Sequence, residues 1–209
     1  MSIRYGVSLI LEPGFTASLH RARQVICSQY GCWAAEMHSV HLPLTGYFPC
    51  PEEEVPALAA ALEKVADDFR SEYTESFLVR TGLLAFGQEE GSIYVPFDGG
   101  SNAISEPRSA DLLQGEVTEV LSRLNLTLGG KLVPLNFALL QHSGLPEQVF
   151  QSAVRFAEGV VNGLQLPGRV ALSELTLFRY ESAAAGEDWS GGSWAADLSW
   201  QIVNAFELS

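Results

Sequence analysis

The chain has 209 residues, of which 47% are hydrophobic and 18% are charged, so it can bury a sizeable core and has no tract polar enough to be disordered. We expect one two-lobed domain over residues 1–209. Twelve Lys and Arg against twenty-five Asp and Glu give a net charge of −13, which argues against binding duplex nucleic acid through its phosphates. A small phosphorylated ligand in a local pocket stays open, because one or two arginines can hold it.

The sequence shows no signal for a membrane, a metal or a cofactor. Its apolar runs stop well short of the roughly 20 residues that cross a bilayer, and the N-terminal residues lack a small-residue cleavage site. Three cysteines cannot all pair within one chain, and no Cys/His cluster has zinc-ligand spacing. We therefore expect a cytoplasmic protein with reduced thiols, no membrane contact, no metal and no cofactor.

The first third of the chain predicts strand, helix and strand. Residues 4–11 are apolar and rich in strand-forming side chains, and a Glu-Pro-Gly turn follows them. Thr16 is placed to cap a helix over residues 16–30, with Gly31 as its stop. Residues 39–48 then predict a second strand.

A clearer helix follows Pro51. Apolar residues recur at spacings of three and four, which places them on one helical face. They are Val55, Leu58, Leu62, Val65 and Phe69. Three glutamates at residues 52–54 lie where the helix dipole favours carboxylates, and we interpret them as helix chemistry rather than as a metal site.

The rest of the chain continues to alternate between the two kinds of element. The predicted elements are strands at 77–86 and 92–97, a helix from Ser109 to Leu124, a strand at 133–140, a helix at 146–161, and strands at 170–180 and 200–208. This order favours an α+β fold with helices packed on antiparallel sheets. It also divides into two similar halves.

Residues 41–48, HLPLTGYF, resemble the first signature of the two-histidine phosphoesterase superfamily, which includes 2′-5′ RNA ligase-like proteins and cyclic phosphodiesterases. The family's signature is His, any residue, Ser or Thr, then an apolar residue. The resemblance implies a bilobal α+β fold: two antiparallel sheets with helices on their outer faces, related by a pseudo-twofold axis around a central cleft.

The same resemblance exposes a degenerate site. On the strand before the 146–161 helix, Asn136 occupies the second histidine position and Ala138 the hydroxyl position, while Pro43 replaces the hydroxyl of the first signature. Only His41 survives of four motif residues, and it is the implied catalytic residue. Asparagine donates and accepts hydrogen bonds but exchanges no proton near pH 7, so we expect Asn136 to bind ligand. Losing one acid–base partner typically costs about 10² to 10⁴ in rate.

Other residues near this pair are candidates for the same site. Thr45 and Tyr47 share the strand parity of His41, and Arg80 lies on a predicted strand, so all three are candidate ligand-binding residues. On a regular strand His38 faces the side opposite to His41. His142 follows Asn136 by six residues, about 20 Å along an extended strand. Neither is expected to replace the missing histidine.

The resemblance implies a cyclic phosphodiesterase or 2′-5′ RNA ligase-like protein that acts on a small cyclic phosphate or an RNA 2′,3′-cyclic phosphate end. The alternative is a catalytically inactive relative that binds a nucleotide or a protein. Whether the chain is an enzyme stays open at this point, because only one of the two family histidines is retained.

Overall fold

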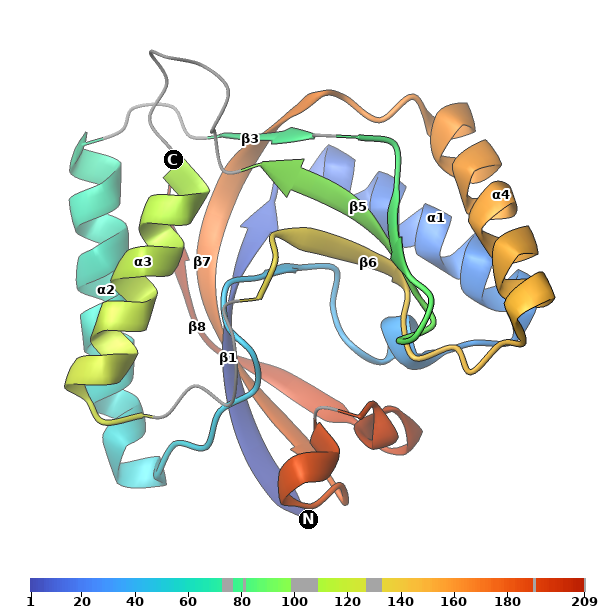
Figure 1. The fold of residues 1–209 in the computed structure, drawn as a ribbon. Helices are drawn as coiled ribbons and strands as arrows, with labels where there is room; N and C mark the ends of the chain where they lie inside the picture. The colour runs from blue at the N-terminus through green and yellow to red at the C-terminus, as the bar shows by residue number, and fades with distance from the viewer. Residues whose placement is uncertain (73–76, 81, 99–108, 127–132, 190, 209) are drawn as a thin grey trace.

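The computed structural model describes residues 1–72, 77–80, 82–98, 109–126, 133–189 and 191–208. These residues form four α-helices and eight strands (Figure 1). The helices are Pro13–Tyr30 (α1), Val55–Glu72 (α2), Ser109–Arg123 (α3) and Glu147–Leu164 (α4). The strands are Ser2–Leu11 (β1), Leu42–Pro43 (β2), Phe77–Arg80 (β3), Ala85–Gly87 (β4), Ser92–Asp98 (β5), Asn136–Leu140 (β6), Arg169–Ser182 (β7) and Ser199–Glu207 (β8).

Strand β7 joins two antiparallel sheets. Its C-terminal part lies between β1 and β8, and β2 extends this sheet beyond β1. Its N-terminal end pairs with β3, which leads to the second sheet of β5, β4 and β6. Every pairing among the described strands is antiparallel. The predicted α+β class with two antiparallel sheets is therefore confirmed, and the two sheets share β7 in one continuous eight-stranded order.

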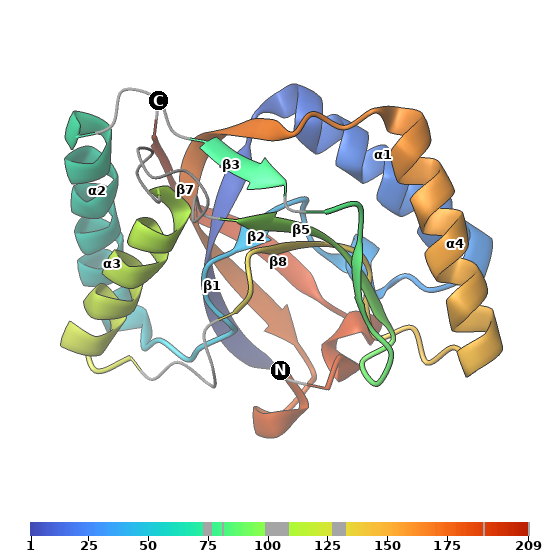
Figure 2. The ribbon, with the colours of Figure 1, turned by 45° about the horizontal axis from the view of Figure 1, so that its top comes forward.

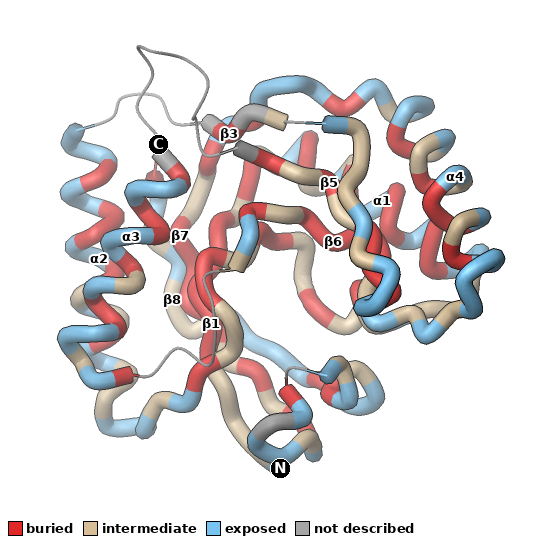
Figure 3. Tube along the Cα trace, viewed as in Figure 1, coloured by how far each residue is buried: buried red, intermediate tan, exposed pale blue. Residues whose placement is uncertain are grey.

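The helices flank the sheets in two pairs, α2 with α3 and α1 with α4 (Figures 1 and 2). Buried residues lie on the sheets and on the inward faces of the helices, while the outer helical faces are exposed (Figure 3). In α2 the buried positions include Leu58, Leu62, Val65 and Phe69, as the apolar spacing predicts. No helix in the described ranges is both long enough and apolar enough to span a bilayer.

Helix α1 begins earlier than predicted. Pro13 stands at its start, where a fixed φ suits the helix and a missing N–H costs nothing, so the first turn forms before Thr16. Thr16 donates its hydroxyl to Leu11 O instead of capping. The predicted stop is confirmed, because Gly31 adopts φ 65° and its N–H binds Cys27 O.

Residues 39–48 do not form the predicted continuous strand. Only Leu42 and Pro43 pair with β1, at the edge of the sheet, and Phe48 makes an isolated bridge with Tyr5. Proline has no N–H to donate to a ladder, so this edge position is the one open to Pro43. Likewise, β3 and β4 replace one predicted strand over 77–86, and both pair with β5.

Candidate functional site

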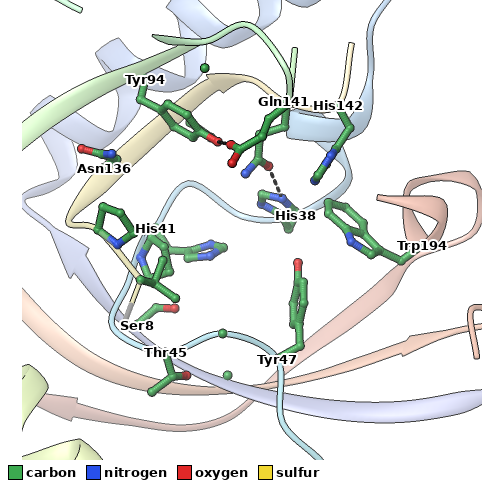
Figure 4. Close-up of a pocket in the computed structure, with 18 of the residues that line it drawn as sticks. Ser8, His38, His41, Thr45, Tyr47, Tyr94, Asn136, Gln141, His142 and Trp194 are labelled. Carbon is green, nitrogen blue, oxygen red and sulfur yellow. Dashed lines mark hydrogen bonds between the residues drawn. The ribbon is translucent and has the colours of Figure 1, made fainter. Parts of the chain in front are cut away.

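A cavity of about 450 Å³ lies where the two sheets meet, and it gathers residues from distant parts of the sequence (Figure 4). Its lining comes from α1, β1, the segment 38–47, the β4–β5 hairpin, β6 and the residues after it, β7, and the turns that contain Trp189 and Trp194. Three of the four histidines of the chain line this cavity: His38, His41 and His142.

His41 is buried in the cavity wall and is held in one tautomer. Its Nδ1 lies 2.8 Å from Ser39 O, and a carbonyl oxygen only accepts, so Nδ1 carries the proton. Nε2 is left with its lone pair and has no hydrogen-bond partner among the described residues. Burial, reinforced by the charge of Arg23, lowers the pKa of His41 to about 4. The imidazole is therefore neutral at physiological pH.

His38 lies beside His41, contrary to the expectation that it faces away. The two ring centroids are 5.2 Å apart, because residues 38–41 leave the short helix Ala34–Met37 as an irregular segment without strand alternation. His38 donates Nε2–H to Gln141 Oε1 at 3.1 Å, as Figure 4 shows. Burial lowers the pKa of His38 well below its usual value. This second imidazole is also neutral.

His142 reaches the same cavity, which corrects its expected position along an extended strand. Strand β6 ends at Leu140, and His142 then adopts φ 46°, so the chain turns rather than extends. The His142 ring packs 5.9 Å from the Trp194 ring, against Gly192 at φ 79°. His38 contacts the same indole at 5.4 Å. Trp194 thus contacts two of the three cavity histidines (Figure 4).

The predicted pair His41 and Asn136 is brought to one cavity. Asn136 begins β6 and is half-buried, and its side-chain amide makes no hydrogen bond with any described residue. Pro43 and Ala138, which the resemblance predicts to stand in place of the two signature hydroxyls, also line the cavity. At the four predicted signature positions the site therefore offers one neutral imidazole, of His41, and one amide, of Asn136.

Thr45 and Tyr47 also line the cavity, as expected. Thr45 Oγ1 accepts a hydrogen bond from the Val7 N–H at 3.0 Å, so this oxygen partly serves the backbone. The hydroxyl proton of Thr45 has no acceptor among the described residues. Tyr47 packs edge-on to Tyr180 and Trp189 and points its hydroxyl into the cavity (Figure 4). Burial raises the pKa of Tyr47, which keeps the phenol protonated.

Arg80 is not among the described residues that line the cavity. It ends β3, where its N–H binds Gly168 O. The buried arginine of the cavity is instead Arg23, on α1, which is 1% exposed. No cluster of three or more His, Cys, Asp or Glu side chains in the described ranges is arranged to hold a metal ion.

Comparison with known proteins gives matches to solved structures. No protein-family model matches the chain, and no curated protein sequence does. The structure of E. coli LigT in apo form matches 100% of this chain and 99% of its own, with a TM-score of 0.56 at 12% identity. A phosphoesterase structure matches over 100% of this chain and 99% of its own chain, with a TM-score of 0.55 at 10% identity. The chain has the fold of LigT-type phosphoesterases.

This LigT-type fold extends over essentially the whole chain. The structure of TT0787 from Thermus thermophilus matches 98% of this chain and 97% of its own, at a TM-score of 0.56 and 16% identity. Identities of 10–16% establish the fold alone. The resemblance implied by residues 41–48 is thus confirmed at the level of fold, and the chemistry has to be argued from the residues in the cavity.

Arg23, His38 and His142 line the cavity although the sequence patterns did not predict them there. Arg23 carried a signal, because it follows Leu19 by four residues and precedes Cys27 by four, which places a charge on the buried face of a helix. His38 and His142 carried none, because both lie on irregular backbone whose side-chain directions follow no period.

Proposed function

We propose that the cavity binds a small phosphorylated ligand of nucleotide type, and that the chain is a binding relative of the phosphoesterases whose fold it has. The observation that carries this proposal is that His41 Nε2 and the Asn136 amide line one cavity and have no hydrogen-bond partner among the described residues. Both groups line the cavity with hydrogen-bonding capacity that a ligand can use. A nucleotide supplies both kinds of partner: a hydroxyl or amino group that donates to His41 Nε2, and oxygen atoms that accept from the Asn136 amide.

The size and walls of the cavity support this ligand class. A volume of about 450 Å³ lies within the roughly 300–1,000 Å³ range of small-molecule sites. Aromatic rings line the cavity, and the half-buried ring of Tyr94 is one against which a base can stack. LigT structures with this fold have been solved with 3′-AMP and with NADP⁺.

Turnover is disfavoured by the same residues. Cleavage of a cyclic phosphate needs a base that activates water and an acid that protonates the leaving oxygen. With a pKa of about 4, His41 is a weak base, and at neutral pH it has no proton on Nε2 to give. Asn136 exchanges no proton, and Pro43 and Ala138 provide no hydroxyl for the phosphate oxygens.

Binding can be tested through intrinsic fluorescence, because Trp189 and Trp194 line the cavity. We expect 3′-AMP and adenosine 2′,3′-cyclic phosphate to bind the wild type, and His41→Ala and Asn136→Ala each to weaken binding roughly 5- to 10-fold through one lost hydrogen bond. His20→Ala is the matched control, since His20 is exposed on α1. If neither nucleotide binds the wild type, the proposal is wrong.

Hydrolysis of a 2′,3′-cyclic phosphate, free or at an RNA end, is the second candidate. It is favoured by the Nε2 lone pair of His41, which can accept a proton from water, and by a second imidazole, His142, in the same cavity. Phosphorus NMR with wild type, His41→Ala and Asn136→His distinguishes the two functions. Turnover by the wild type that disappears in His41→Ala supports hydrolysis. Turnover gained only in Asn136→His, and not in the exposed control Asn162→His, supports a silent binding site.

A further inference from the structure

Arg23 is a buried cation that the two motif positions do not explain. It lies on the inward face of α1, is 1% exposed, and lines the same cavity as His41 and Asn136. Its guanidinium carbon lies 4.9 Å from the centroid of the Phe137 ring. A charge at such a position destabilises a fold unless it is paired.

Three of the five N–H donors of this guanidinium are used by main-chain carbonyls. Nε donates to Ala138 O at 3.1 Å, and Nη1 donates to His38 O at 3.0 Å and to Ser39 O at 3.5 Å. The two donors on Nη2 have no partner among the described residues. The side chain is thus fixed by the backbone on one side and keeps a free pair of donors.

The charge itself has no direct counter-ion in the described part of the chain. No carboxylate there lies within 4.0 Å of the guanidinium. Burial lowers the pKa of Arg23 to about 10, against the smaller opposing effect of the Glu36 carboxylate. Since the cavity histidines are neutral, Arg23 is the permanent cation among the described lining residues.

We propose that Arg23 is the anion-binding residue of the cavity and that its Nη2 donors bind an oxygen of the ligand's phosphate. This inference rests on the proposed function and deepens it by assigning the phosphate contact to a residue outside both family signatures. Charge-assisted hydrogen bonds from arginine to phosphate are shorter and stronger than neutral ones, and the bound anion supplies the missing counter-charge.

Arg23 also has a structural role, because its carbonyl contacts tie α1 to residues 38–39 and to β6. A test must therefore separate anion binding from support of the cavity wall. Loss of support for the cavity wall weakens the binding of every ligand alike. Loss of the anion contact weakens the binding of charged ligands only, and it removes the salt dependence of that binding.

The experiment compares adenosine 2′,3′-cyclic phosphate with uncharged adenosine, at low and high NaCl, on the full chain. The variants are Arg23→Gln, Arg23→Lys and the matched control Arg21→Gln, which removes an exposed charge two residues away on the same helix. Thermal unfolding of each variant verifies that it is folded.

We expect Arg23→Gln to weaken binding of the cyclic phosphate roughly 10- to 100-fold and to abolish the salt dependence of that binding. The affinity of the variant for adenosine should stay within about 2-fold of the wild-type affinity. Arg23→Lys should lose less affinity for the cyclic phosphate and should keep the salt dependence of binding. If Arg23→Gln does not fold, Arg23→Lys decides whether Arg23 binds the anion. Arg21→Gln should match the wild type.

Equal losses for adenosine and the cyclic phosphate in Arg23→Gln, or loss of the salt dependence in Arg23→Lys, would overturn the assignment of Arg23 while leaving the binding function intact. Absence of any nucleotide binding to the wild type would overturn the binding function itself. The two failures are therefore distinguishable.

Discussion

Single residues in the cavity wall have ionisation properties that their sequence neighbours do not reveal. His41 hydrogen-bonds the carbonyl of Ser39, and its ring is buried against the Phe178 ring, 5.4 Å away. Its pKa of about 4 follows from this burial and from the Arg23 charge. The folded protein therefore resists protonation of His41, which links stability to pH.

We expect the free energy of unfolding to fall as the pH drops from about 6.5 to about 4. In that window the unfolded chain protonates His41, whose ordinary pKa is 6.5, and the folded chain does not. The contribution is about 1.4 kcal/mol per pH unit, and above pH 6.5 it vanishes because both states are neutral. Burial shifts the pKa of His38 in the same direction and adds to this loss.

Urea unfolding at about pH 7 and pH 5 measures this effect in the wild type and in His41→Gln. The variant should lose about 2 kcal/mol less than the wild type over that interval. His20→Gln, at an exposed position, should behave as the wild type does. A pH dependence in His41→Gln that equals the wild-type one would show that His41 is not the group responsible.

At the scale of the element, the turns between β7 and β8 hold one wall of the cavity. A Cβ on Gly192 would lie 2.4 Å from His142 Cγ, and its φ of 79° suits glycine. Trp194 follows two residues later, is buried, and donates its indole N–H to Trp189 O. The glycine therefore permits the close packing of this segment against His142.

Gly192→Ala should destabilise the fold by about 1–3 kcal/mol, through backbone strain and the displacement of His142, and should shift the Trp fluorescence spectrum. Gly159→Ala is the opposing control. Gly159 is exposed in α4 with nothing within 4 Å of an added Cβ, so this change should stabilise the protein by about 0.5–1 kcal/mol. Equal effects of the two substitutions in a thermal unfolding assay would contradict this account.

At the scale of the molecule, the two sheets share β7 and one main hydrophobic core. Residues from all four helices and from both sheets belong to the same buried cluster. We therefore propose that residues 1–209 unfold as one cooperative unit rather than as two independent lobes.

This cooperativity predicts that tryptophan fluorescence and far-ultraviolet circular dichroism give coincident unfolding transitions. Trp189 and Trp194 lie in the small aromatic cluster beside the cavity, whereas circular dichroism reports on all helices. Leu175→Ala, in the shared strand, should lower both midpoints together, with a loss of about 2–5 kcal/mol for a fully buried leucine. A fluorescence transition that precedes the loss of helix would show that the lobes unfold separately.

The sequence by itself determined the fold class and most of the elements, although residues 39–48 and 77–86 do not form the continuous strands predicted. The 3.6-residue spacing in α2, the Gly31 stop and the apolar runs of β1 and β7 are local signals, and the structure bears them out. The HLPLTGYF segment pointed to the phosphoesterase fold and to His41, and the same resemblance predicts that Asn136 stands at the second histidine position.

Only the tertiary structure decided which residues share the cavity. His38 and His142 lie on irregular backbone, where side-chain directions depend on contacts rather than on a period. Arg80 has strand spacing but does not line the cavity, while Arg23 reaches it from a helix that precedes both signatures. Local sequence fixes backbone preferences over a few residues. Long-range packing brings together α1, the 38–41 segment and β6. The same packing buries the cavity histidines, which keeps them neutral. It thereby leaves Arg23 as the permanent cation among the described lining residues.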